Sequence, residues 1–191
     1  MSTERILVHE SVASQFREAF AAAVRAEILS KPDMRPVVID TLSADKNRAL
    51  IADAIRQGAH LEQGTAEIIS EAPTQMLPTV ISGVEKNMDI YQTESFGPSV
   101  SLFSFKTESE ALELANDTEY GLSAAVFTEN LQTGLRLARQ LESGAVHINS
   151  MTVHDEYPLP HGGVKSSGFG RFNGYQGLDE FLYTKTVTWM V

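Results

Sequence analysis

From residue 98 onward the chain alternates between strand-like and helix-like patterns, and this alternation constrains the fold more than any other feature. Runs of apolar and β-branched residues predict strands, whereas apolar residues three and four apart predict helices. Short links between such elements are typical of an α/β unit with a largely parallel sheet. The predicted order is a strand at 99–105, a helix from 107 to 116, a strand at 124–127, a helix at 131–141 and a strand at 145–149.

The remaining elements are predicted from the same patterns and from capping residues. Thr107 and Glu110 form an S/T-x-x-E capping box before the helix that follows them, and Gly58 and Gly144 are suitable helix stops. The polar, poorly patterned segment 64–78 predicts a loop. The other predicted elements are strands at 5–9 and 77–81, helices at 11–28 and 43–57, a short helix near 177–183 and a last strand at 184–190.

Charge and composition argue against several classes of protein. The formal net charge of −10 argues against nucleic acid as a partner, because phosphate binding needs a basic surface. The 191 residues contain no cysteine, so they supply no disulfide, thiolate metal site or thiol nucleophile. No apolar run is long enough to cross a membrane, and Glu10, Glu18 and Glu27 argue against a mitochondrial targeting helix. We therefore expect a cytoplasmic protein without a membrane partner.

The glycine-rich segment 160–174 has two interpretations. Gly168, Gly170 and Gly174 resemble a dinucleotide-binding fingerprint, which must follow a strand and open a helix within a βαβ unit. Too few residues follow Gly174 for the rest of such a unit. The favoured interpretation is a tight loop whose glycines permit positive φ and close backbone approach.

A second polar segment contains His147, His154, Asp155, Glu156 and His161. A metal site is one interpretation, but no pair has the i, i+4 spacing of helical zinc ligands. The favoured interpretation is an ordered polar loop around the mouth of a ligand site, with no metal.

Glu94 comes just before a Gly97-Pro98 turn that leads directly into the strand at 99–105. A lone carboxylate near a turn is usually solvated. Its place at the head of a strand favours a role in ligand binding, because ligands of α/β folds gather at strand ends.

Three segments, in order, carry a family resemblance: "ESFGPSVSLFSF", "ELANDTEYGLSAAVFTEN" and "ESGAVHIN…PHGGVKSSGFGR". They resemble the C-terminal, catalytic-domain half of the NAD(P)-dependent aldehyde dehydrogenase superfamily. The resemblance extends from "MSTERILVHESV" to "TKTVTWM" and is closest to the vanillin and salicylaldehyde dehydrogenases. It implies an α/β fold with a mostly parallel sheet flanked by helices. It also implies a truncated catalytic domain at 1–175 and a C-terminal helix and oligomerisation-type strand at 176–191.

The resemblance implies an enzyme class and a set of site residues. In the family a cysteine thiolate attacks an aldehyde, hydride passes to NAD or NADP, and a glutamate activates the water that hydrolyses the thioester. It assigns Glu94 to the hydroxyls of the nicotinamide ribose, Phe96 to the nicotinamide and Lys46 to the same ribose. His161 stands where the family usually has phenylalanine, which implies a changed aldehyde pocket.

The resemblance also places the family's catalytic cysteine immediately before Met1, so it assigns no catalytic residue to this chain. The dinucleotide-binding domain, the general base and the oxyanion asparagine would precede it too. We therefore expect the chain alone to bind no cofactor tightly and to be inactive and prone to oligomerise or aggregate. The alternative is a non-catalytic protein that forms a homo-oligomer or pairs with full-length aldehyde dehydrogenase subunits.

Overall fold

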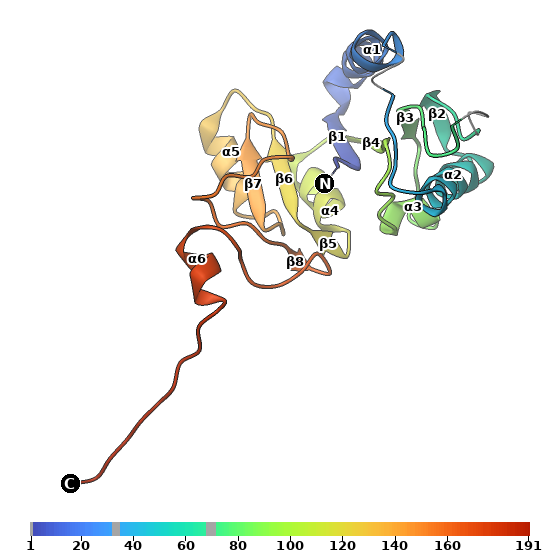
Figure 1. Cartoon of the computed structure of the whole chain (residues 1–191). Coiled ribbons are helices and arrows are strands. Elements are labelled where there is room, and N and C mark those ends of the chain that lie inside the picture. The colour runs from blue at the N-terminus through green and yellow to red at the C-terminus, as the bar shows by residue number, and fades with distance from the viewer. Residues whose placement is uncertain (1, 32–34, 68–71) are drawn as a thin grey trace. The chain divides into compact units, whose positions relative to one another are not determined.

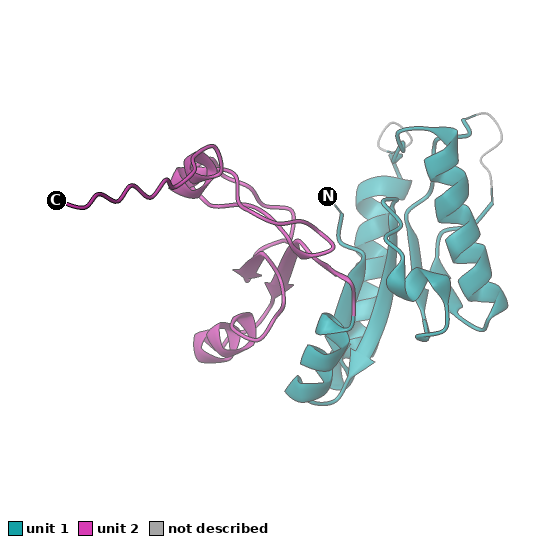
Figure 2. Ribbon diagram, turned by 90° about the horizontal axis from the view of Figure 1, so that it is seen from below, with its two compact units in different colours: residues 1–117 teal, residues 118–191 magenta. Residues whose placement is uncertain are grey.

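The computed structural model describes residues 2–31, 35–67 and 72–191. The chain divides into two compact units, Met1–Asp117 and Thr118–Val191. Figure 1 labels the elements of both units, and Figure 2 colours the units separately.

The first unit is built on a four-stranded sheet with the order β1-β4-β3-β2. β1 pairs with β4 in parallel from Arg5↔Ser101 to His9↔Phe105, and β4 pairs with β3 in parallel. β2 is antiparallel to β3 and closes the edge. The strands are β1 (Arg5–His9), β2 (His60–Gln63), β3 (Thr79–Ser82) and β4 (Ser99–Phe105).

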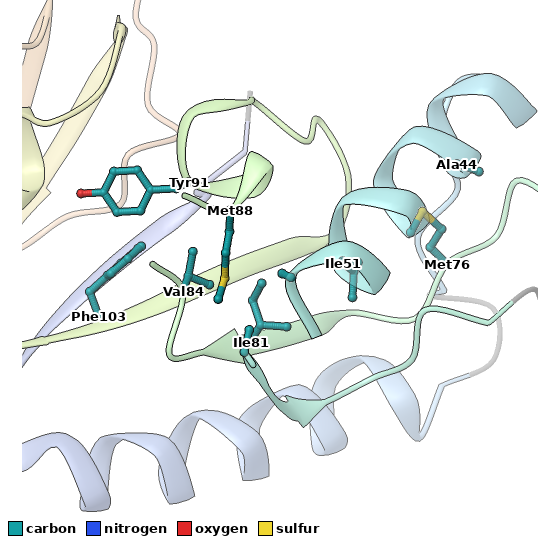
Figure 3. Packing of buried hydrophobic residues seen from close by; sticks show 10 residues of the cluster. Ala44, Ile51, Met76, Ile81, Val84, Met88, Tyr91 and Phe103 are labelled. Atoms are coloured by element: carbon teal, nitrogen blue, oxygen red, sulfur yellow. The ribbon is translucent and has the colours of Figure 1, made fainter. Parts of the chain in front are cut away.

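Helices cover both faces of this sheet, because its strands alternate their side chains between the faces. Ile81 joins the cluster that α2 (Thr41–Arg56) covers, whereas the neighbouring Val80 lines a small pocket with Phe20 of α1 (Ala13–Val24). Figure 3 shows the two helices on opposite sides of the strands. The unit also contains α3 (Asp89–Gln92), α4 (Glu108–Asn116), a 3₁₀ turn at Glu10–Val12 and a π-helical turn at Arg25–Leu29.

The main core lies between α2, α3 and the sheet (Figure 3). Ile51 and Ile81 are both 0% exposed at its centre, and burying such a side chain contributes about 1.5–3 kcal/mol. The larger cluster consists of Ala44, Ile51, Ala54, Ala59, Met76, Ile81, Val84, Met88, Tyr91 and Phe103.

The second unit contains two small strand pairs. β6 and β7 are parallel from Ser123↔Ala145 to Val126↔Ile148, and β5 and β8 are antiparallel. Gly134 of α5 lets that helix approach β7, since an added Cβ would lie 3.1 Å from the Ile148 side chain. The elements are β5 (Tyr120–Gly121), β6 (Ser123–Val126), α5 (Leu131–Ala138), β7 (Ala145–Ile148), β8 (Val164–Lys165) and α6 (Gly174–Asp179).

The structure confirms the α/β class with a mostly parallel sheet, and it corrects the predicted last strand. Residues 182–191, all within the described part of the chain, belong to no helix or strand, so the strand predicted at 184–190 is not formed. A strand needs a neighbouring strand for its hydrogen bonds, and this segment pairs with none among the described residues.

Two further features concern the loops and helices. The glycine-rich segment is a loop apart from the two residues of β8, with positive φ at Gly168, Gly170 and Gly174, and α6, which begins at Gly174, has only six residues. The tight-loop interpretation is therefore confirmed.

Within residues 2–31, 35–67 and 72–191, no helix is long and apolar enough to cross a membrane.

Candidate functional site

The turn 93–98 connects α3 to β4, and the carboxylate of Glu4 holds it. Glu4 Oε2 accepts the backbone N–H of Ser95 at 2.9 Å, and Glu4 Oε1 accepts that of Phe96 at 2.9 Å. Phe96 has a φ of 52°, which residues with a Cβ rarely adopt. Its side chain is 65% exposed. Two charge-assisted hydrogen bonds thus stabilise a strained turn that exposes an aromatic ring.

Asn47 of α2 supports the other side of the turn. Its Nδ2 donates to the Ser95 carbonyl at 3.4 Å and to Ser99 Oγ at 3.2 Å. Ser99 Oγ in turn donates to Ser95 Oγ at 3.0 Å. A Cβ on Gly97 would lie 2.2 Å from Asn47 Nδ2, so a glycine is needed for this close approach.

Lys46 and Glu94 bring opposite charges to the same turn. Lys46 Nζ donates to the Glu94 backbone carbonyl at 2.8 Å rather than to its carboxylate. The half-buried Glu94 carboxylate forms no hydrogen bond with any residue that the structure describes. Burial raises the Glu94 pKa, the negative charge of Glu4 raises it further, and the charge of Lys46 opposes both effects. Glu94 therefore offers two unpartnered acceptor oxygens.

The turn lies at the amino-terminal edge of the parallel strands. Ser101 N–H donates to the Glu4 carbonyl at 2.9 Å, and Thr79 N–H donates to the Pro98 carbonyl at 2.8 Å. The segments that precede β1, β3 and β4 therefore meet here. Ligands of open α/β sheets usually bind at the carboxyl ends of strands. This general rule, on which the sequence-based choice of Glu94 rested, therefore favours the opposite edge of the sheet from the one where Glu94 lies.

The structure thus brings Lys46, Glu94 and Phe96 together, whereas His161 lies in the second unit and is described there. His161 is 8% exposed, and its ring centroid lies 5.0 Å from that of Phe172. Its Nδ1 lies 3.9 Å from Asp155 Oδ1, which also accepts a hydrogen bond from Asn173 Nδ2 at 2.7 Å. His161 is therefore a packed side chain that helps to order its loop.

His147 and His154 pack together in the same unit, with ring centroids 5.1 Å apart. Nε2 of His147 is buried and has no hydrogen-bond partner in the described part of the chain. Burial lowers the His147 pKa, and the nearby charges of His154 and His161 lower it further. No group of three or more His, Cys, Asp or Glu among the described residues could hold a metal ion.

Sequence reasoning missed the two residues that hold the turn, Glu4 and Asn47. Glu4 comes just before β1, and the N–H groups that it accepts are more than 90 residues away in the sequence. Asn47 is a polar residue on the apolar face of α2, with 0% exposure. That misplaced amide was the only signal, because a buried polar side chain usually has a specific partner.

The fold is an α/β unit, and its candidate site is an exposed turn that bears a half-buried carboxylate. Residues 1–187 match the aldehyde dehydrogenase family. The chain therefore belongs to the aldehyde dehydrogenase family, which confirms the resemblance.

Individual relatives agree with this assignment. The chain is 40% identical to a vanillin dehydrogenase of Pseudomonas fluorescens, over 98% of this chain and 39% of that protein. A salicylaldehyde dehydrogenase from Pseudomonas putida G7, solved with salicylaldehyde, matches with 33% identity and a TM-score of 0.84, over 93% of this chain and 37% of that one. A betaine aldehyde dehydrogenase from Staphylococcus aureus, solved with NAD⁺, matches with 34% identity and a TM-score of 0.85, over 95% and 37%. The chain thus spans about two fifths of the length of these relatives.

Proposed function

We propose that this chain supplies the part of an aldehyde dehydrogenase active site that contacts the nicotinamide half of NAD or NADP. Glu94 would accept hydrogen bonds from the ribose hydroxyls, Lys46 would lie near the same ribose, and the ring of Phe96 would pack beside the nicotinamide. The observation that carries the proposal is the half-buried Glu94 carboxylate, which has no hydrogen bond to any described residue.

The residues present fit such a cofactor. Two carboxylate oxygens can each accept from one of two adjacent hydroxyls, and Phe96, in the same turn, leaves a large apolar surface exposed. Lys46 keeps its main-chain contact to the turn while its charge favours the ionised form of Glu94. The nicotinamide, when bound, accepts a hydride. The role of this chain is to bind and orient it.

The proposed reaction is the oxidation of an aldehyde to a carboxylic acid. The 191 residues contain no cysteine, so the thiol nucleophile must come from outside them. An aromatic aldehyde is the preferred substrate class, because relatives of this chain are named vanillin, benzaldehyde and salicylaldehyde dehydrogenases. We propose that His161 influences the shape of the aldehyde pocket. The cytoplasmic location of the protein stays a prediction.

A second candidate function is a non-catalytic subunit that pairs with itself or with other aldehyde dehydrogenase subunits. It is favoured by the exposed apolar side chains near residue 191, which include Tyr183, Val187, Trp189 and Met190. An extended segment with free backbone groups can add to the sheet edge of another chain. Light scattering of the purified chain tests this candidate, since a stable monomer that captures no such subunit would contradict it.

Activity and thiol labelling together distinguish the candidates. The chain would be purified with whatever subunits accompany it and assayed for benzaldehyde-dependent reduction of NAD⁺ and NADP⁺. We expect activity that a thiol-blocking reagent abolishes without labelling this chain. We also expect Glu94→Gln to remove it, whereas Glu18→Gln, an exposed change on α1, retains it. Activity that survives thiol blocking or Glu94→Gln would contradict the proposal.

A further inference from the structure

We propose that Glu4 is a positioning residue for the cofactor site. Its hydrogen bonds connect the start of β1 to the turn that carries Glu94 and Phe96, and so orient these two side chains. This inference rests on the proposed function of Glu94 and Phe96. It concerns a residue that contacts neither the ribose nor the nicotinamide in that proposal.

The first argument is the way in which the carboxylate of Glu4 is held. Its main-chain carbonyl accepts the Ser101 N–H at 2.9 Å, which fixes Glu4 at the edge of the sheet. From there both carboxylate oxygens accept successive N–H groups, of Ser95 and Phe96, each at 2.9 Å. A carboxylate suits this role because it has only acceptor sites and can take two donors at once.

The second argument is the position of those two N–H groups in the turn. They belong to the residue after Glu94 and to Phe96 itself, so the peptide units that direct both functional side chains are held by Glu4. Phe96 keeps a φ of 52°, and such a conformation persists only where the surroundings determine it. Asn47, on a different element, holds the Ser95 carbonyl, whereas Glu4 accepts the two N–H groups.

The third argument is electrostatic. The charged groups that act on Glu94 from the packed elements are Glu4, before β1, and Lys46, on α2. The negative charge of Glu4 disfavours the ionised form of Glu94, while its own charge is satisfied by two N–H donors. Hydroxyl groups that donate to Glu94 would favour its ionised form and so offset the effects of burial and of the Glu4 charge on its pKa.

Three variants separate the geometric effect of Glu4 from its charge. Glu4→Gln removes the charge and one acceptor, Glu4→Asp keeps the charge but shortens the reach, and Glu18→Gln is the control on α1. NMR would measure amide hydrogen exchange at Ser95 and Phe96 and the titration of the Glu94 carboxyl carbon. Exchange should be roughly tenfold faster in both Glu4 variants. The Glu94 pKa should fall in Glu4→Gln.

Unchanged exchange and an unchanged Glu94 titration in Glu4→Gln, in a protein that remains folded, would overturn the inference. A second readout uses the active assembly described above. There Glu4→Gln should raise the KM for the cofactor about tenfold with a smaller change in kcat. The variant misorients the groups that bind the cofactor but removes no group that takes part in the chemical step. NMR effects without any effect on cofactor use would overturn the role of Glu4 at the cofactor site, whereas the proposed function itself is tested separately by Glu94→Gln.

Discussion

Gly97 approaches Asn47 so closely that a Cβ on Gly97 would lie 2.2 Å from Asn47 Nδ2. The turn that carries Glu94 and Phe96 is thereby packed directly against α2, the helix that also carries Lys46. The position of the turn on α2 therefore depends on a glycine at 97.

Gly97→Ala should destabilise the first unit by about 1–3 kcal/mol, because the added methyl group must displace a fully buried amide. Urea unfolding measures the change in free energy. A matched test adds Asn47→Ala, which creates room for the methyl group. The double variant should lose less stability than the two single changes added together. Strict additivity of the two changes in unfolding free energy would contradict the predicted steric clash between residue 97 and Asn47.

Arg5→Ala should destabilise the first unit by about 2–4 kcal/mol. The guanidinium donates to the carbonyls of Asp117 at 2.8 Å and Leu114 at 2.9 Å, at the end of α4. It also lies 4.7 Å from the centroid of the Tyr91 ring. Arg25→Ala is the control, since Arg25 is exposed. Equal unfolding midpoints for the two variants would contradict this account.

Asp117 should contribute stability that is lost in acid. Hydrogen bonds from Lys86 and Tyr91 lower its pKa below the ordinary 3.8, with the Lys86 contribution the larger. Because the folded state favours the charged form, the contribution is complete well above pH 3.8 and is lost as the pH falls through the lower, folded value. Asp117→Asn should therefore be less stable than the parent at neutral pH, and the difference should shrink as the pH falls below 3.8 and Asp117 becomes protonated in the folded state. A difference in unfolding free energy that does not depend on pH would contradict the assignment.

His154→Gln should raise the pKa of His147 toward its ordinary value of 6.5, because it removes one of the charges that lower it. The signals of the His147 ring in NMR spectra measure this titration, and His60→Gln, in the other unit, is the control. The lowered pKa of His147 also sets the direction in which pH changes the stability of the second unit. Since the folded pKa is lowered, the second unit loses stability as the pH falls from 6.5 through the folded value. An unchanged His147 titration in His154→Gln would contradict the proximity of the two charges.

The sequence was sufficient for the elements whose apolar pattern is complete. The strands at 5–9 and 99–105 were predicted with the observed bounds, since their β-branched, leucine and aromatic residues are typical of strands. The Thr107 cap was also confirmed, because its hydroxyl accepts the Glu110 N–H at 3.2 Å. By contrast, β2 was missed because its residues are mostly exposed and show no alternation.

Two other differences have a physical origin outside the local sequence. The segment 184–190 has strand propensity but no partner among the described residues, and propensity alone forms no ladder. The predicted helix at 131–141 ends as α5 at Ala138, with irregular structure from there to β7. The support of the candidate site was likewise invisible, because it depends on contacts between Glu4 and a turn more than 90 residues away.

The central claim, that the Glu94 turn is the ribose site, is tested most directly by NMR titration of the 191-residue chain with nicotinamide mononucleotide, the half of the cofactor that this chain is proposed to contact. Millimolar concentrations of the ligand would compensate for the absence of the contacts that the other half makes. We expect amide shifts centred on Lys46 and on residues 94–97, and their loss in Glu94→Gln. Shifts centred instead on the glycine loop 168–174, or unchanged by Glu94→Gln, would contradict the account.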